Sequence, residues 1–313
     1  MSKYLIKKDG ILMGFDTISD KPDAYLPPVG PRLNNEMTDV LWKKGDKVGY
    51  HEHATGIETF YLVQGLVEVV VRGKRFVLEP GDILQLAPFT PHSFKFPEEN
   101  TIWRELFTDL EMHKGIKTKS DLRTYYPEKA QDPEYMKEIS AICGDIKLEE
   151  PIAEDVDKKT MYEVRTPEFA HNTFVMGGLI LRMKVGRWET FGFKEIWEVI
   201  FEKGVKLSNK EEPEYSIGLF SITKGSFEFE VGHETFIAEP GDLVQIPEFV
   251  SYSFKALEDG STFLDLNCQS HMLRLLETLR GYQVRSPEKL QDKEFVKKTL
   301  LAHDCYITGY ERE

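Results

Sequence analysis

Two histidines, a glutamate and a third histidine are the residues of this sequence best suited to bind a metal ion. His51 and His53 are two positions apart, Glu58 follows closely, and His92 comes later in the chain. Side chains two positions apart on a strand point to the same face, so both imidazoles of the pair can reach one site. Three imidazoles and one carboxylate suit a divalent first-row metal such as Fe, Mn, Ni or Zn. An octahedral ion bound in this way keeps two positions open for water, substrate or O₂.

The segments around these residues indicate short strands separated by tight turns. Runs of β-branched and aromatic residues such as "FYLVQ", "LVEVVV" and "DILQLAP" alternate with turns at Gly65, Gly73 and Gly81. A turn after the histidine pair would bring Glu58 back toward it on the next strand. Regular spacing of this kind is typical of a β-sandwich or barrel, so the sequence predicts an all-β fold.

The chain repeats itself at a shift of 160 residues. "EPGDILQLAPFTPHSFK" from Glu79 matches "EPGDLVQIPEFVSYSFK" from Glu239, and further segments keep the same shift. A constant internal shift indicates a tandem duplication. We therefore expect an N-terminal domain at residues 1–150 and a C-terminal domain at residues 160–313. The charged stretch "LEEPIAEDVDKKT" would be the linker between them.

Each repeat closes with helix signals. "DPEYMKEISAICG" offers Asp132 as an N-cap, Pro133 at the first helical position and Gly144 as a stop. "SHMLRLLETLRG", from Ser270, has apolar residues at helical spacing and predicts a helix that ends at Gly281. Each β-domain should therefore be followed by short helices.

The first candidate segment resembles a known family motif. In "GDKVGYHEHATGIETFYLVQG" the histidine pair, the glutamate and the bounding Gly45 and Gly65 match the first motif of the cupins at every position. "PGD", followed by a histidine ten positions after its aspartate, resembles the second motif, although Phe96 stands where an asparagine is frequent. The resemblance covers most of the chain and implies two tandem cupin-type jelly-roll barrels, a bicupin. The metal ligands that it implies are His51, His53, Glu58 and His92.

The second repeat keeps none of these ligands. Under the shift of 160, their positions fall on Glu211, Pro213, Gly218 and Tyr252. Proline and glycine have no side-chain donor, and two isolated oxygen donors are too few for a tight site. We expect the C-terminal domain to lack metal and to support the fold or a dimer, with a second small ligand as the alternative.

Strand alternation also predicts what surrounds the metal. Phe60 and Leu62 share a face with Glu58, and Phe94 and Phe96 share a face with the third histidine, which gives an apolar, aromatic wall. Such a wall suits a small organic ligand.

Two residues are candidates for catalytic roles. Glu58 could take a proton from the substrate if it leaves the metal. Arg104, a charged residue within the apolar strand "TIWRELF", could hold a substrate carboxylate through two hydrogen bonds. The arginine could equally face outward and pair with Glu105 or Glu68.

Composition narrows the class of protein. The chain has 313 residues, of which 41% are hydrophobic, and no apolar run approaches the length needed to span a bilayer. Its net charge of -13, without a basic stripe, argues against nucleic acid as a partner. Three widely spaced cysteines and an N-terminus without a signal-peptide pattern favour a cytoplasmic protein. A small-molecule substrate is the expected partner, and the resemblance adds a possible homodimer.

The resemblance also suggests an activity. Cupins with this ligand set include dioxygenases, so the first hypothesis is a metal-dependent dioxygenase acting on a small organic substrate. A non-redox enzyme is the alternative, in which the metal acts as a Lewis acid in an isomerase, a decarboxylase or a lyase. A cupin that binds a small molecule without catalysis also stays open, because a fold does not fix a function.

Overall fold

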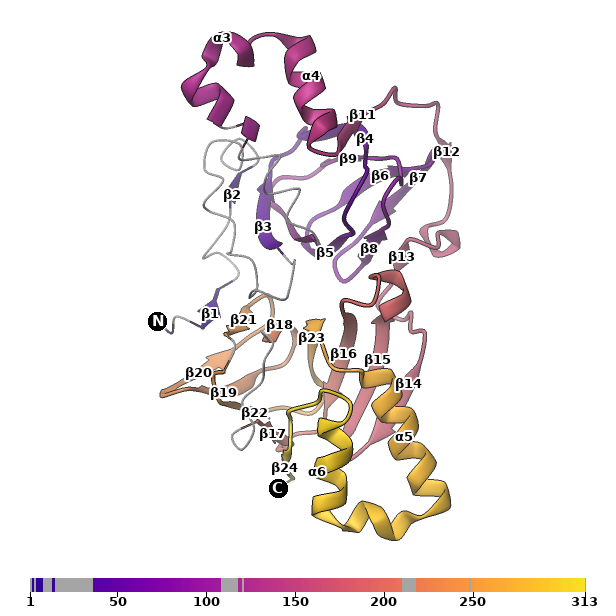
Figure 1. Ribbon diagram of the computed structural model, residues 1–313, viewed down its shortest axis with the longest axis vertical. Helices are drawn as coiled ribbons and strands as arrows, with labels where there is room; N and C mark the ends of the chain where they lie inside the picture. Colours follow the sequence, from indigo (N-terminus) through magenta and orange to yellow (C-terminus); the bar gives the residue numbers. More distant parts are fainter. Residues whose placement is uncertain are drawn as a thin grey trace. The chain divides into compact units, whose positions relative to one another are not determined.

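The computed structural model describes residues 2, 4–7, 13–14, 36–107, 118–119, 121–209, 218–247 and 249–312 (Figure 1). The chain divides into two compact units, Ile11–Phe169 and Met1–Gly10 together with Ala170–Glu313. Each unit consists of two packed sheets followed by helices, which confirms the predicted all-β class with two jelly-roll barrels. The first unit extends past residue 150, and the opening ten residues belong to the second unit.

The N-terminal unit contains two six-stranded sheets. The first has the order β13 (Val164–Arg165), β8 (Ile83–Leu86), β5 (Glu58–Gln64), β10 (Thr101–Phe107), β3 (Glu36–Trp42) and β2 (Met13–Gly14). The second has the order β11 (Asp145–Lys147), β4 (Lys47–His53), β9 (His92–Lys95), β6 (Val67–Val71), β7 (Lys74–Leu78) and β12 (Glu154–Asp155). The inner faces of these sheets meet in one buried cluster of aliphatic and aromatic residues, because alternate side chains of each strand point inward.

Gly65, between β5 and β6, occupies a position that only glycine fits. Its φ of +86° lies in the left-handed region, and an added Cβ would stand 2.4 Å from Thr101 Oγ1. Gly225 repeats this arrangement in the second unit, where an added Cβ would stand 2.5 Å from Ser261 Oγ. The turn therefore packs closely against Thr101, the first residue of β10, and this contact holds β10 in place.

The charged segment suggested as a linker packs on the N-terminal barrel. It follows β11 directly and forms β12 and a short 3-10 helix, η2 (Lys158–Thr160). Lys158 Nζ donates to both Asp82 Oδ2 and Glu79 Oε2 at 2.6 Å, which ties η2 to the "EPGD" turn. The ion pair and the pairing of β12 with β7 explain why the first unit continues to Phe169.

The C-terminal unit contains a seven-stranded and a five-stranded sheet. The first has the order β1 (Leu5–Ile6), β21 (Leu243–Ile246), β18 (Gly218–Lys224), β23 (Ser261–Cys268), β16 (Glu195–Phe201), β15 (Leu179–Val185) and β14 (Thr173–Met176). The second has the order β20 (Glu234–Ala238), β19 (Phe227–Val231), β22 (Tyr252–Ala256), β17 (Lys206–Ser208) and β24 (Gly309–Glu311). A 3-10 helix, η3 (Arg187–Glu189), precedes β16.

The sequence repeat is also a repeat of strand order. The order β8-β5-β10-β3 of the first unit recurs as β21-β18-β23-β16, and β4-β9-β6-β7 recurs as β17-β22-β19-β20. Even the turn contact recurs, because Lys7 Nζ donates to Asp242 Oδ2 at 2.7 Å as Lys158 does to Asp82. Since β1 pairs with β21 as β13 pairs with β8, the first residues complete the second barrel.

Helices follow each barrel. In the first unit they are α3 (Pro127–Ala130) and α4 (Pro133–Ile142), and Asp132 caps α4 by accepting from the backbone N–H groups of Glu134 and Tyr135, as predicted. In the second unit they are α5 (Met272–Arg285), η4 (Pro287–Gln291) and α6 (Lys293–Leu301). The predicted end at Gly281 is wrong, because α5 continues to Arg285. An isolated glycine lowers helix stability by about 1 kcal/mol without breaking the helix. Within the described residues, no helix is long and apolar enough to cross a membrane.

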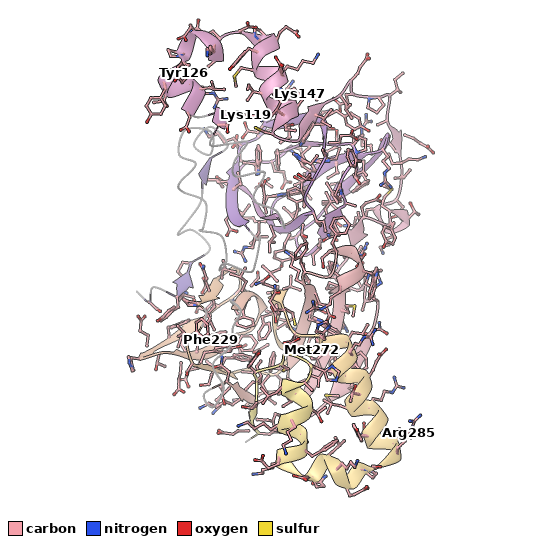
Figure 2. The ribbon with its side chains drawn as sticks, in the orientation of Figure 1. Lys119, Tyr126, Lys147, Phe229, Met272 and Arg285 are labelled. Carbon is pink, nitrogen blue, oxygen red and sulfur yellow. The ribbon has the colours of Figure 1, made fainter. Side chains whose placement is uncertain are left out.

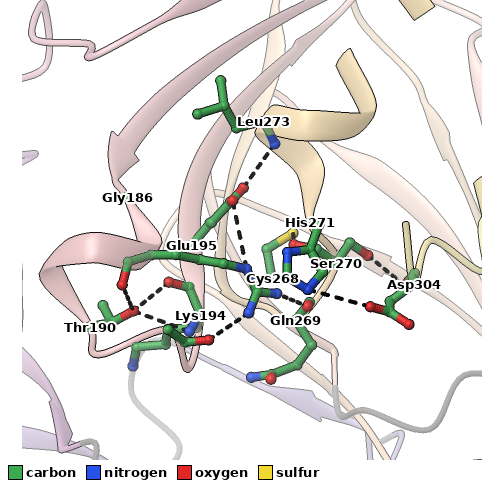
Figure 3. A network of polar contacts seen from close by, with 12 residues as sticks. Gly186, Thr190, Lys194, Glu195, Cys268, Gln269, Ser270, His271, Leu273 and Asp304 are labelled. Carbon is green, nitrogen blue, oxygen red and sulfur yellow. Dashed lines mark hydrogen bonds and ion pairs between the residues drawn. The ribbon is translucent and has the colours of Figure 1, made fainter. Parts of the chain in front are cut away.

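A polar network fastens α5 to the second barrel (Figure 3). Glu195 Oε2 accepts a hydrogen bond of 3.2 Å from the Leu273 backbone N–H and one of 2.6 Å from Trp197 Nε1. A carboxylate at the first turn of a helix satisfies an amide that the helix leaves unpaired and interacts favourably with its dipole. Arg187 donates to the Gln269 backbone oxygen, which connects η3 to the segment before the helix.

Candidate metal centre

The four predicted ligands come from three strands in the two sheets of the N-terminal barrel. β4 carries His51 and His53 at its end, and β9 begins with His92. β4 pairs antiparallel with β9, and a register shift after Val48 places His51 directly opposite His92. Glu58 begins β5 in the other sheet. The barrel thus brings all four side chains together, although they are distant in sequence.

The donor nitrogens of the three histidines lie within 4.8 Å of one another, and the Glu58 carboxylate lies beside two of them. The Nε2 atoms of His51 and His53 are 3.1 Å apart, and the Glu58 carboxylate oxygens lie 3.2 Å from His53 Nε2 and 3.3 Å from His92 Nε2. Two ligands at right angles on a metal with bonds of roughly 2.1 Å are about 3.0 Å apart. The observed separations therefore fit adjacent ligands on one octahedral ion.

Hydrogen bonds to the other ring nitrogens aim two of the imidazoles. Nδ1 of His51 lies 2.8 Å from the Gly49 carbonyl, and Nδ1 of His92 lies 2.8 Å from the Thr90 carbonyl. A carbonyl only accepts, so both Nδ1 atoms carry the proton and both Nε2 atoms present a lone pair. His92 Nε2 is buried and makes no hydrogen bond among the described residues. A buried lone pair directed at the cluster is what a metal ligand requires.

The electrostatics of the cluster keep its ligands in metal-binding form. Burial lowers the pKa of His92 to about 4, and burial together with His53 lowers the pKa of His51. Burial alone would raise the pKa of Glu58, but His53 and His92 outweigh it and lower that pKa to about 2. Burial opposes charge on His53 too, yet Glu58 raises its pKa above the usual value. Near neutral pH, Glu58 is therefore ionised, and His51 and His92 are neutral.

The part of the chain that carries this site matches a known protein family. The model of the cupin domain family matches residues 39–103, which include all four converging side chains. The chain contains a cupin domain in its N-terminal barrel. Its second barrel repeats the strand order of the matched domain, as described above. A search of curated proteins finds no match.

Solved structures that resemble this chain are distant in sequence. A cupin 2 conserved barrel domain protein from Leptotrichia buccalis is 12% identical with a TM-score of 0.46, over 75% of this chain and 83% of its own. An oxalate decarboxylase from Bacillus subtilis with Mn(II) centres is 17% identical with a TM-score of 0.43, over 74% and 68%. The Lactobacillus farciminis oxalate decarboxylase formate complex is 13% identical with a TM-score of 0.43, over 74% and 76%. At these identities the activities of those enzymes do not transfer to this chain.

Arg104 lies away from the histidines of the metal centre. Its neighbour Trp103 packs on Phe60 in the barrel core, with ring centroids 4.8 Å apart, so alternation turns Arg104 to the opposite face of β10. There its Nε and Nη2 donate to the two Asp39 carboxylate oxygens at 2.6 and 2.7 Å. Both side chains are buried. The structure thus brings Arg104 to Asp39, rather than to Glu105 or Glu68 or to the four clustered ligands.

Sequence reasoning missed Glu105 as a site residue. It pairs with Phe60 across β5 and β10, and cross-strand partners share a face, so its carboxyl group belongs to the inner face that carries Glu58. Burial, Glu58 and Asp39 raise the pKa of Glu105 well above its usual range. The signal was present in "TIWRELF", where a glutamate alternates with an inward tryptophan, but the adjacent arginine masked it.

Aromatic rings form the wall beside the cluster. The His92 ring lies 5.1 Å from the Phe94 ring, and Phe94 in turn contacts Phe60 at 5.3 Å between centroids. Phe96 stacks on Trp42 at 4.0 Å deeper in the barrel. The metal centre therefore borders an apolar, aromatic interior.

The second barrel has a different interior at the corresponding positions. Glu211 and Pro213 lie outside the described residues, whereas Gly218 begins β18 and Tyr252 begins β22 with its side chain buried. A Cβ added to Gly218 would stand 2.7 Å from Cε2 of Phe220. The Phe220 ring thus occupies the space that the Glu58 side chain takes in the first barrel. Phenylalanines from several strands pack around it.

Metal binding should release about one proton per ion near pH 6. Ligands must be deprotonated to bind metal, and His53 is the ligand whose raised pKa keeps it protonated there. The apparent affinity should rise about tenfold per pH unit from about pH 5 to the pKa of His53 and level off above it. Calorimetry with Mn(II) in two buffers of different ionisation enthalpy measures the proton count. A release of two or three protons at pH 6 would contradict the lowered pKa values of His51 and His92.

Proposed function

We propose that the N-terminal barrel is a mononuclear metal enzyme for a small organic substrate and that a dioxygenase is the first candidate. The observation that carries this proposal is the convergence of His51, His53, Glu58 and His92 at the spacing of adjacent octahedral ligands. Four protein ligands on an octahedral ion would leave two positions for a bidentate substrate or for a substrate and O₂. A bound divalent metal would supply Lewis acidity and, if redox-active, reactivity toward O₂.

The residues of the chain prepare this site in three ways. Gly49 and Thr90 hold His51 and His92 in the tautomer that presents Nε2. Glu58 supplies one negative charge that offsets part of the ion's charge. The wall formed by Phe60 and Phe94 excludes water and favours an apolar or aromatic part of the substrate.

A second candidate function is proton-transfer chemistry of an isomerase, decarboxylase or lyase. The observation that favours it is Glu105, a carboxyl group on the inner face of β10 whose pKa is raised well above its usual range by burial, Glu58 and Asp39. A general acid works best when its pKa is close to the working pH. Glu58 is less suited to take a proton, because its pKa of about 2 makes it a weak base.

Turnover in the presence and absence of O₂ distinguishes the candidates. Protein loaded with Fe(II), Mn(II) or Zn(II) is incubated with catechols, enolisable diketones and 2-hydroxy acids, while an oxygen electrode and product analysis follow each reaction. Substrate-dependent O₂ consumption that His51→Ala abolishes supports the dioxygenase. Anaerobic conversion that Glu105→Gln abolishes, with metal content unchanged, supports the proton-transfer enzyme. Saturable uptake of a compound without product would overturn catalysis in favour of a binding protein.

A further inference from the structure

We propose that the rim of the metal centre recognises an anionic group of the substrate, a carboxylate, through Lys119 and Lys147. This inference rests on the proposed function, since it names the class of molecule that the metal site would bind. Figure 2 labels both lysines at the end of the unit that carries α3 and α4.

The edge strand β11 runs directly beside the histidine pair. Asp145 pairs with His53, and Lys147 pairs with His51 in the antiparallel register of β11 and β4. Directly opposite residues share a face, with Cβ atoms about 4.5–5.5 Å apart. The side chains of Asp145 and Lys147 therefore lie on the same face as the metal-binding imidazoles, next to them in the sheet. Glu52, between the two histidines, lies on the opposite face by alternation.

Lys119 reaches the same rim from the helical segment that precedes α3. Its Nζ donates to Asp145 Oδ2 at 2.6 Å, and both side chains are 22% exposed. Asp145 thus fixes the ammonium group of Lys119 next to β11 while leaving it accessible to solvent. An ammonium group has three N–H donors, so a substrate oxygen can be bound in addition to Asp145. After burial and Glu58, Asp145 and Lys119 are the next charges that act on the pKa of His53, which places both near the ligands.

The balance of charge at the rim favours an anion. Two lysines face one aspartate there, although the protein as a whole carries a net charge of -13. Within the barrel, a divalent ion would outweigh the single negative charge of Glu58. A carboxylate bound at an open metal position would then have a second favourable charge at the entrance. The aromatic wall beside His92 limits the rest of the molecule to a small, largely apolar body.

Anion binding to the Co(II)-loaded protein tests the inference without turnover. The chain is titrated with malonate and with its uncharged analogue malonamide, and visible absorption of the bound Co(II) reports occupancy. We expect malonate to bind and malonamide to bind at least tenfold more weakly. Lys119→Gln should weaken malonate about tenfold, and Lys147→Gln should weaken it about threefold because that side chain is exposed.

Two controls separate charge recognition from structure. Lys137→Gln, on the exposed surface of α4, should leave malonate affinity unchanged. Lys119→Arg should restore most of the affinity that Lys119→Gln loses, since it keeps the charge next to Asp145. Equal malonate affinity in the wild type and in a Lys119→Gln/Lys147→Gln double variant of unchanged metal content would overturn the inference, as would equally tight malonamide. Charge-dependent malonate binding without any turnover would sink the proposed enzyme and leave the anion site standing.

Discussion

Replacing His51 with alanine should lower the metal content of the purified protein from about one divalent ion per chain to less than about a tenth. His51 Nε2 lies 3.1 Å from His53 Nε2 and belongs to the group of three histidine donors that lie within 4.8 Å of one another. Without it, only three donors remain to bind the ion, so the affinity for metal should fall steeply. Elemental analysis after dialysis, with melting temperature as a check on folding, measures the effect.

A histidine elsewhere provides the matched control. His233 is exposed in the second barrel, so His233→Ala should retain the full metal content. An unchanged content in His51→Ala would show that the four side chains form no site. Two ions per wild-type chain would instead show that the second barrel binds metal, against the expectation from Gly218 and Tyr252.

Replacing Arg104 with methionine should lower the free energy of unfolding of the first barrel by about 3–5 kcal/mol. The change leaves Asp39 buried without the guanidinium that pairs with both of its carboxylate oxygens. Adding Asp39→Leu should recover much of the loss, because two apolar side chains can replace a buried ion pair. Urea unfolding followed by circular dichroism measures each variant.

The exposed ion pair between Lys74 and Glu154 is the control for this prediction. Lys74→Met should change the free energy of unfolding by no more than about 1 kcal/mol, because water screens a pair at the surface. A stable Arg104→Met variant that has lost malonate binding would show that Arg104 holds the substrate, as the sequence had suggested. The pairing with Asp39 would then be a resting contact.

The four metal ligands could be predicted from the sequence because strand alternation and short turns determine where they point. The choice between Arg104 and Glu105 could not be made in this way, since both are charged neighbours in one apolar strand. The pairing of β10 with β5 shifts register between Ile102 and Trp103, so counting residues along β5 does not show which residues of β10 point inward. A shift of one residue along β10 would exchange the side chain that faces the metal centre for its neighbour.

Contacts between segments that are distant in the chain could not be predicted from the sequence either. Asp145 reaches His53 only because β11 joins the edge of β4, and no local pattern shows which edge a three-residue strand will extend. The helix α5 continues through Gly281 to Arg285, and its start is fastened by Glu195 of strand β16. Tertiary contacts of this kind override the local preferences of a glycine or a charged segment.

The ring of Phe220 against Gly218 has a consequence for protein engineers who would graft a second active centre onto this molecule. Transplanting the imidazoles and the carboxylate into the second barrel would fail on its own, because the Phe220 ring already fills the space that the carboxylate needs. The ring would have to be trimmed in the same design, and the cavity left behind would destabilise that barrel.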